Sequence, residues 1–259
     1  MHRLLSALTA FASITALTAA ASAASTPPII TFNANWTITQ SAPLVAGQPA
    51  VFRYNISRLP TCRATYNSSP AWAISATYQA DSSSTVPTLM VTNGGTNNNP
   101  IDVPFTVPYG VDLSVWFQNA DDWGCSKWDS NYGQNYHFAI QGPPTIHFNV
   151  DGTNPVAGTL KGGAAIAIDY DVRRLSTCRS TYNGFQAWSV SVSYRFDGGA
   201  IASASLSYIP GGSQGQQTPA VISAPAGAHQ VEMWFQNNDV NGCNAYDSRY
   251  GQNYVFTLQ

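Results

Sequence analysis

The sequence contains two copies of one segment, and this internal repeat limits the possible folds more than any other feature. The nine residues Trp128–Tyr136 return as Tyr246–Tyr254, and a Gly-Cys pair precedes each copy. Further upstream, Arg58–Asn67 returns as Arg174–Asn183. The spacing between the copies is far longer than the units of about 20–50 residues that build solenoids. The repeat therefore indicates two tandem domains of one fold.

The chain divides into three parts. Residues 1–24 resemble a secretory signal peptide, with a positively charged start, the apolar stretch Leu4–Ala19 and small residues at Ala21–Ala23 for cleavage. Residues 25–141 form the first predicted domain and residues 142–259 the second. We expect a secreted, extracellular or periplasmic protein without a membrane-inserted segment.

Export determines how the cysteines are interpreted. In an oxidising compartment an even number of cysteines indicates disulfides, whereas in the cytosol it indicates metal or redox chemistry. The four cysteines fall two to a repeat. Of the three possible connectivities, the simplest joins Cys62 to Cys125 and Cys178 to Cys243. Each bridge closes a loop of about sixty residues and contributes on the order of 4 kcal/mol in the chain-entropy model.

Alternation of apolar and polar residues predicts β-strands. Trp72, Ile74 and Tyr78 alternate with small or polar residues, and residues 188–196 repeat this pattern. After the signal peptide, no segment keeps a helical period. About seven short strands per repeat are typical of an immunoglobulin-like sandwich. The predicted fold class is all-β, with two tandem immunoglobulin-like antiparallel β-sandwich domains, each closed by one disulfide.

Four tryptophans lie on the predicted strands. Alternation places Trp72 and Trp188 in the core. Trp116 and Trp234 lie on the opposite strand face from their apolar neighbours. They form either a second packing layer or an exposed platform.

Composition restricts the class of ligand. Only 9% of residues are charged, 12% are aromatic and the formal net charge is −2. The chain has no basic stripe, so we expect neither nucleic acid nor an anionic membrane surface as a partner. Many aromatic and amide side chains with few charges favour a neutral, hydroxyl-rich ligand, a glycan or polysaccharide.

The predicted disulfides bring two distant loops to one end of each sandwich, where aromatic, amide and charged side chains gather. Flat aromatic rings cover the apolar face of a sugar, while amides and carboxylates hold its hydroxyls. The candidate ligand-binding residues of repeat 1 are Arg63, Tyr66, Asn67, Trp128, Asp129, Tyr132 and Asn135. Those of repeat 2 are Arg179, Tyr182, Asn183, Tyr246, Asp247, Tyr250 and Asn253.

The segment Trp128–Tyr136 resembles the Trp-Asp-Asn…Asn-Tyr signature of starch-binding modules of carbohydrate-binding module family 21. Members of that family are immunoglobulin-like sandwiches that bind α-glucans, so the resemblance implies ligand contacts by aromatic and Asn residues of the segment. Ser130 and Ser248 replace the first Asn of the signature, and Tyr246 stands where repeat 1 has Trp128. A wider pattern, spanning most of each repeat, is similar to a family of secreted bacterial domains of unknown function.

The same motif also has a structural interpretation. Asp129 and Asp247 can each cap a turn by an Asx hydrogen bond. The repeated tyrosines can tie loops to the sheets, as a tyrosine corner does. Arg58 or Arg63 can pair with Asp129 in a purely structural role, which is to hold the loops in place. This alternative predicts an extracellular or cell-envelope structural or interaction protein whose motif stabilises the fold.

We predict no catalytic site, no metal and no other cofactor. Glu232 is the only glutamate, so a pair of acid and base carboxylates would need aspartates alone. Enzymatic chemistry around Asp129 and Asp247 is kept as a minor alternative. The oxygen-rich loop Asp129–Asn131 is a calcium candidate, but Arg249 at the matching position of repeat 2 would repel the ion.

Overall fold

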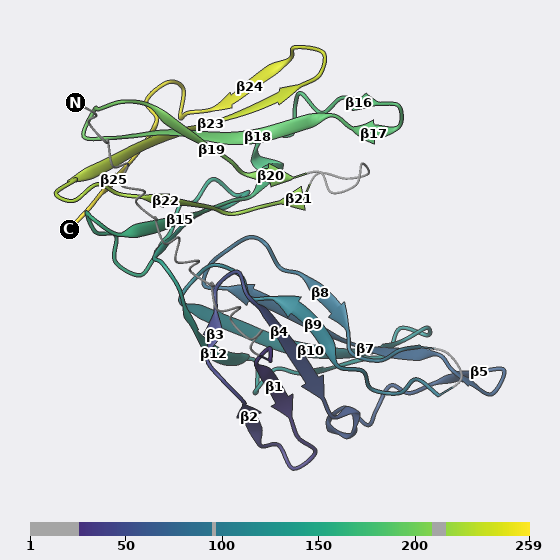
Figure 1. The fold of residues 1–259 in the computed structure, drawn as a ribbon. Coiled ribbons are helices and arrows are strands. Elements are labelled where there is room, and N and C mark those ends of the chain that lie inside the picture. The colour runs from purple at the N-terminus through teal and green to yellow at the C-terminus, as the bar shows by residue number, and fades with distance from the viewer. Residues whose placement is uncertain (1–25, 95–96, 209–215) are drawn as a thin grey trace, which may run out of the picture.

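Residues 26–94, 97–208 and 216–259 are described in the computed structural model, and the predicted signal peptide lies outside them. The helices among these residues are two three-residue 3₁₀ turns, η1 (Ile56–Arg58) and η2 (Val172–Arg174). Neither is long or apolar enough to cross a membrane. Buried hydrophobic side chains form two clusters, one between residues 30 and 140 and one between residues 146 and 258. Figure 1 shows the strands of the first half and those of the second half as two separate groups, and each cluster belongs to one of them.

Repeat 1 is built from short strands. They are β1 (Ile29–Phe32), β2 (Ile38–Gln40), β3 (Leu44–Val45), β4 (Pro49–Tyr54), β5 (Thr65–Tyr66), β6 (Ser69–Pro70), β7 (Trp72–Ala80), β8 (Thr88–Met90), β9 (Val103–Thr106), β10 (Asp112–Asp121), β11 (Ser126–Asp129) and β12 (Tyr136–Gln141).

Repeat 2 follows the same order, except that no described strand corresponds to β3 and that the hairpin β20–β21 is added. Its strands are β13 (Thr145–Phe148), β14 (Val156–Ala157), β15 (Ala165–Tyr170), β16 (Thr181–Tyr182), β17 (Phe185–Gln186), β18 (Trp188–Phe196), β19 (Ala202–Ser205), β20 (Ser207–Tyr208), β21 (Gln216–Gln217), β22 (Ala220–Ser223), β23 (Gln230–Asp239), β24 (Asn244–Asp247) and β25 (Tyr254–Thr257).

Two sheets face each other in each repeat. In repeat 1 the orders are β2-β1-β4-β9 and β3-β12-β10-β7-β8, with β11 paired to β10. In repeat 2 they are β14-β13-β15-β22 and β19-β18-β23-β24, with β25 paired to β23. Most neighbours are antiparallel, while β1–β4, β13–β15 and β3–β12 run parallel. Both repeats are therefore immunoglobulin-like β-sandwiches, as the alternation predicts.

The described strands outnumber the roughly seven predicted for each repeat. Repeat 1 alone contains twelve, because two-residue hairpin strands such as β5 and β6 count separately. A pair of residues is too short to show an alternating pattern, so such strands cannot be detected from periodicity.

The long central strands carry the core. β7 buries Ile74 and Ala76 toward the facing sheet, and β10 buries Val115 and Phe117 beside them. Trp188 is buried in the core of repeat 2, as predicted. Its counterpart Trp72 is half-buried and packs against the core cluster of repeat 1. Trp116 and Trp234, the two tryptophans left open, are half-buried on the outer face of their sheet.

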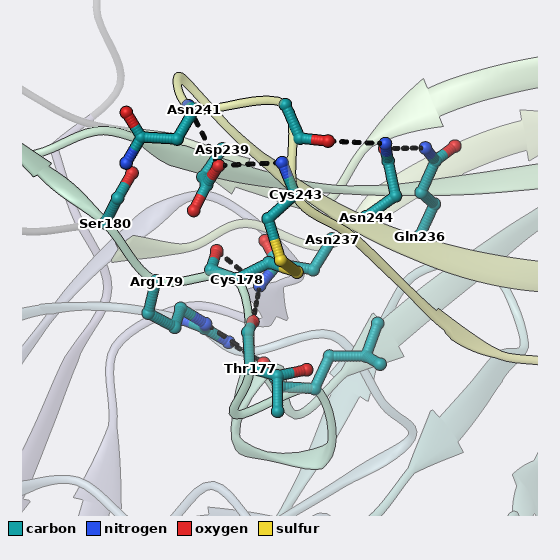
Figure 2. Close-up of a disulfide and its surroundings, with 12 residues drawn as sticks. Thr177, Cys178, Arg179, Ser180, Gln236, Asn237, Asp239, Asn241, Cys243 and Asn244 are labelled. Carbon is teal, nitrogen blue, oxygen red and sulfur yellow. Dashed lines mark hydrogen bonds between the residues drawn. A yellow bond between two sulfur atoms is a disulfide. The ribbon is translucent and has the colours of Figure 1, made fainter.

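Both predicted disulfides are present, one inside each repeat. Cys62 bonds to Cys125 and Cys178 to Cys243, each pair with its Cα atoms 5.3 Å apart. Figure 2 shows the second bridge, which joins the loop after η2 to the turn between β23 and β24. There the buried Asn237 donates from Nδ2 to the Thr177 carbonyl oxygen at 2.5 Å. The covalent bond and this hydrogen bond together fix the end of the sandwich that carries the β16–β17 hairpin, with the predicted residues Tyr182 and Asn183.

The two repeats touch through the loop that follows β7. Its Ser83 hydroxyl donates to Asp169 of β15 at 2.8 Å. The imidazole of His147 on β13 is fully buried, 2.9 Å from Asp169 through Nδ1 and 3.2 Å from Asp81 through Nε2. Burial lowers the pKa of His147, but hydrogen bonds to the two carboxylates outweigh it and raise that pKa to about 9. At neutral pH a protonated histidine therefore lies between two aspartates at this interface.

Candidate functional site

The aspartate that both copies of the motif contain lies inside the protein. Asp129 is buried and accepts from Nε of Arg58 at 2.7 Å and from the Tyr54 hydroxyl at 2.8 Å. The Tyr136 hydroxyl donates to its other carboxylate oxygen. Burial is the main cause that raises the pKa of Tyr136 to about 12, so this tyrosine remains a neutral donor.

Repeat 2 has the same arrangement. Asp247 accepts from Nε of Arg174 at 2.8 Å and from the Tyr170 hydroxyl at 3.0 Å, and the Tyr254 hydroxyl binds its second oxygen. Burial opposes the charge of Arg174, but its bonds with Asp247 outweigh this and raise the arginine pKa. Of the predicted ligand-binding residues, the two aspartates thus act as anchors that tie the motif to η1 and η2.

The buried carboxylate also explains why the calcium candidate is unfavourable. Asp129 points toward Arg58 and not into its own Asp-Ser-Asn loop, so its oxygens already bind donors. Among the described residues, no group of three His, Cys, Asp or Glu side chains is arranged to hold a metal ion.

The predicted arginines also have local structural contacts. Arg63 donates to the carbonyl oxygens of Leu59 and Ile56 and lies 4.5 Å from the Trp72 ring centroid. Arg179 makes the matching contacts, with its guanidinium 3.5 Å from the Trp188 ring. Both arginines close the turn after a 3₁₀ helix and cover a core tryptophan.

The predicted asparagines help to form turns. Asn67 and Asn183 have φ values of 48° and 50°, which two-residue β-hairpins of the type found at β5–β6 and β16–β17 require. Asn135 and Asn253 are half-buried with φ near 60°. Their amides donate to Ser114 and Glu232, respectively.

The predicted aromatic residues, in contrast, are exposed. Tyr132 and Tyr250 have relative accessibilities of 104% and 107%, the values of side chains in open solvent. Trp128 and Tyr246 on the adjacent strands are each more than half exposed, and so are Tyr66 and Tyr182 on the small hairpins.

The backbone at the two most exposed tyrosines is unusual. Tyr132 has φ of 59° and Tyr250 φ of 58°, in the left-handed region that a bulky residue seldom adopts. The residue before each is left-handed too, and the amide of Gly133 donates to the Ser130 carbonyl oxygen at 3.0 Å. A tight turn therefore presents each tyrosine at its tip. Because the ring buries almost nothing, this strain is not offset by packing.

The predicted composite surface is divided in the structure. Tyr66 lies beside Trp123, with ring centroids 6.3 Å apart, at the disulfide end of the sandwich. In repeat 2, Tyr246 and Tyr250 line a cleft of about 740 Å³ to which Tyr182, Asn183 and Arg179 do not contribute. The hairpin residues and the turn tyrosines are therefore separate surface features.

This cleft of repeat 2 lies between the turn-tip loop and the turn after β13. Gly152, Asn154 and Gln252 line its sides, and Arg174 with Asp247 lies at its floor. The exposed Arg249 adds a positive charge at its rim. We call it the repeat 2 cleft.

The sequence reasoning did not identify a residue that differs between the repeats at this place. In repeat 1 the turn after β1 carries Trp36, whose ring centroid lies 4.5 Å from the guanidinium carbon of Arg58. In repeat 2 the matching turn carries Gly152. The side chains of Arg58 and Asp129 are 0% and 2% exposed, whereas those of Arg174 and Asp247 are 7% and 16% exposed. Alignment of Asn33–Thr37 with Asn149–Thr153 would have revealed the exchange.

A cluster at the repeat interface contains Ser, His and Asp but does not form a nucleophile and its base. Ser83 donates to the carboxylate of Asp169, and both nitrogens of His147 contact aspartates. A nucleophilic serine would instead bond to the imidazole. The cluster holds the two repeats together.

Comparison with protein families gives one match, which covers residues 25–259 and is described as "Family of unknown function (DUF6209)". The chain belongs to this family. The match treats the two repeats as one unit. It agrees with the expected family of unknown function and does not extend to starch-binding modules. No curated protein matches the chain in sequence.

Eleven solved chains match in fold. One comprises the FN1–FN3 domains of chicken CNTN1, with 6% sequence identity, a TM-score of 0.25, and coverage of 90% of this chain and 68% of that chain. A TM-score this low carries no argument about function.

Proposed function

We propose that this DUF6209 protein is a secreted, non-catalytic carbohydrate-binding protein that uses the exposed aromatic residues of its two repeated loops. The observation that carries the proposal is the pair Tyr132 and Tyr250. Each is fully exposed at a left-handed turn position, in both repeats. A side chain that costs backbone strain and buries no surface contributes little to stability, which favours a role in binding.

The chemistry of the loops agrees with a sugar ligand. Exposed rings such as Trp128 and Tyr246 offer flat apolar faces for a pyranose, and the low charge of the chain suits a neutral polymer. The resemblance of Trp128–Tyr136 to the signature of carbohydrate-binding module family 21 supports the same class of ligand. Two linked sites would add avidity on a polysaccharide surface. The two disulfides are consistent with an oxidising compartment.

Retention on insoluble polysaccharides tests the proposal. Wild-type protein should be retained on at least one of starch, cellulose, chitin or bacterial cell-wall glycan. Tyr132→Ala or Tyr250→Ala should each weaken retention by about tenfold, the loss expected for one ring contact. The double variant should lose retention, because avidity disappears with the second site.

A matched control is Ile201→Ala, which truncates an exposed apolar side chain on the β18–β19 connection. It should bind like wild type. Absence of retention on every glycan, or equal retention of wild type, the double tyrosine variant and Trp128→Ala with Tyr246→Ala, would falsify the proposal.

The alternative is an extracellular or envelope interaction protein whose motif serves the fold. The buried contacts of Asp129 and Asp247 favour it for those two residues. This alternative predicts that the tyrosine variants are retained on polysaccharides to the same extent as wild type.

A further inference from the structure

The turns after β1 and β13 are held by the same hydrogen bonds, and the largest of their three sequence differences is Trp36 against Gly152. In repeat 1, Thr37 donates from its amide to the Asn35 side chain, and in repeat 2 Thr153 donates in the same way to Asp151. Each turn is also held by the arginine that pairs with the buried aspartate, Arg58 in repeat 1 and Arg174 in repeat 2. Nη1 of Arg58 donates to the Asn33 carbonyl oxygen at 3.1 Å, and Nη1 of Arg174 donates to Asn149 at 2.9 Å. Trp36 and Gly152 therefore occupy equivalent positions.

Trp36 adopts φ of 67°, a conformation unfavourable for a large side chain, and 60% of its surface remains exposed. In this conformation the Trp36 ring stacks on the guanidinium group of Arg58, which is a favourable cation–π contact. With Phe32, Tyr54 and Tyr136 also within 6 Å of this guanidinium, the ring of Trp36 adds a further aromatic wall.

Arg174 keeps the three inner rings but has no ring at the turn. Phe148, Tyr170 and Tyr254 lie 5.5 to 5.6 Å from its guanidinium carbon. Gly152 supplies no side chain, and a Cβ built there would meet no atom of the described residues within 4 Å. The space that Trp36 fills in repeat 1 is therefore part of the repeat 2 cleft.

The hydrogen bonds of Arg174 restrict what can occupy this space. Its Nε binds Asp247, its Nη2 binds the Tyr254 hydroxyl, and its Nη1 binds Asn149 and Asn154. Each of these three nitrogens already donates to the protein, so a sugar hydroxyl would have to share a nitrogen with a protein acceptor. The planar face is still available, and a guanidinium face stacks preferentially on an aromatic ring.

We propose that the repeat 2 cleft binds an aromatic side chain of a partner polypeptide, seated over Arg174 as Trp36 is seated over Arg58. Tyr246 and Tyr250 line the cleft and provide further ring contacts. This site is distinct in ligand class from the glycan contacts proposed above, and it exists in one repeat only.

Nuclear magnetic resonance of the folded protein, residues 25–259, with N-acetyl-L-tryptophanamide as the probe tests the proposal. Titration should shift the Nε–H resonance of Arg174 by the ring current of the bound indole, in a saturable manner. The Nε–H resonance of Arg58 should not move, because Trp36 already covers that side. Maltoheptaose, added separately, distinguishes a sugar ligand from an aromatic one.

Three variants separate ring occupancy from backbone effects. Gly152→Trp should fill the cleft in cis and weaken probe binding by about tenfold or more, the effect of one stacked ring. Gly152→Ala imposes the same left-handed strain without a ring and should keep wild-type binding. Trp36→Gly should open the equivalent place in repeat 1, so that Arg58 also responds and the binding stoichiometry rises from one to two.

Three outcomes would overturn the proposal. The first is the absence of a saturable Arg174 shift with the probe. The second is an Arg174 shift with maltoheptaose and none with the aromatic amide, which would make the cleft part of the glycan site. The third is equal probe binding by Gly152→Trp and Gly152→Ala. The glycan proposal stands or fails separately, by retention of the tyrosine variants.

Discussion

Repeat 1 and repeat 2 keep the same buried frame and differ at the surface above it. Arg58 with Asp129 and Arg174 with Asp247 make the same bonds to the same tyrosine positions. Trp36 covers the first pair, and Gly152 leaves the second open to a cleft. The comparison shows that both repeats keep the buried groups that hold the motif, while the exposed turn position above the arginine differs.

The paired strands β13 and β15 at the repeat interface differ in the same way from β1 and β4 of repeat 1. In repeat 2, His147 pairs in register with Asp169 and receives the loop of repeat 1. The matching pair in repeat 1 is Thr31 with Arg53, and Arg53 forms an exposed ion pair with Asp102. One face is thus an interface and its counterpart a solvated surface.

The largest expected effect concerns the two arginines. Arg58→Met should lower the free energy of unfolding by about 3–5 kcal/mol, because Asp129 would be left charged and buried. Arg174→Met should cost about 2 kcal/mol less, since Asp247 faces the cleft and retains some hydration. Urea denaturation measures both. In a Trp36→Gly background, the stability loss caused by Arg58→Met should approach the loss caused by Arg174→Met. Equal losses for the two single variants would show that Trp36 does not determine the dielectric around Arg58 and Asp129.

The interface histidine should make stability depend on alkaline pH. Its pKa rises from 6.5 to about 9 in the folded protein. The contribution, about 3 kcal/mol, is therefore present in full below pH 6.5 and is lost as the pH rises through about 9. Denaturation of wild type and His147→Gln at pH 6 and pH 10 checks this. The difference between them should shrink at the higher pH, and a constant difference would contradict the ion-pair assignment.

Exchange of the turn residues should change stability little. Trp36→Gly relieves left-handed strain and loses the stack on Arg58, so the net change should stay within about 1 kcal/mol. Gly152→Trp reverses both effects. Gly152→Ala should be the least stable of the three, since it has strain without stacking. Thermal unfolding ranks them, and a more stable Gly152→Ala than Gly152→Trp would mean that the indole does not stack on Arg174.

The smallest effect is a gain in stability at the turn tips. Tyr132→Gly and Tyr250→Gly should each raise the free energy of unfolding by about 0.5 kcal/mol, because glycine adopts positive φ without steric cost. The gain should be equal in the two repeats, which share this turn. A clear loss of stability in either variant would mean that the ring supports the fold and would remove the main argument for binding.

Several features could be predicted because they depend on local pattern or on duplication. The alternation in Trp72–Ala80 indicates a half-buried strand, and the placement of two cysteines in each repeat indicates the disulfides found. The exposure of Tyr132 and Tyr250 follows from their position in a loop between strands. By contrast, the motif does not reveal that Asp129 points inward, because the direction of its carboxylate depends on its pairing opposite Phe117 on β10.

The sequence by itself determined the two all-β repeats, their disulfide pairs and the aromatic loops, since strand periodicity and cysteine placement are local or repeated signals. The tertiary structure decided which of those side chains are anchors and which are free. Arg58 meets Asp129 and His147 meets Asp81 across long stretches of chain, and only the packing of sheets and repeats creates these contacts. The cover over each arginine is likewise decided in space. It depends on the turn after β1 or β13 lying against the 3₁₀ turn that carries Arg58 or Arg174.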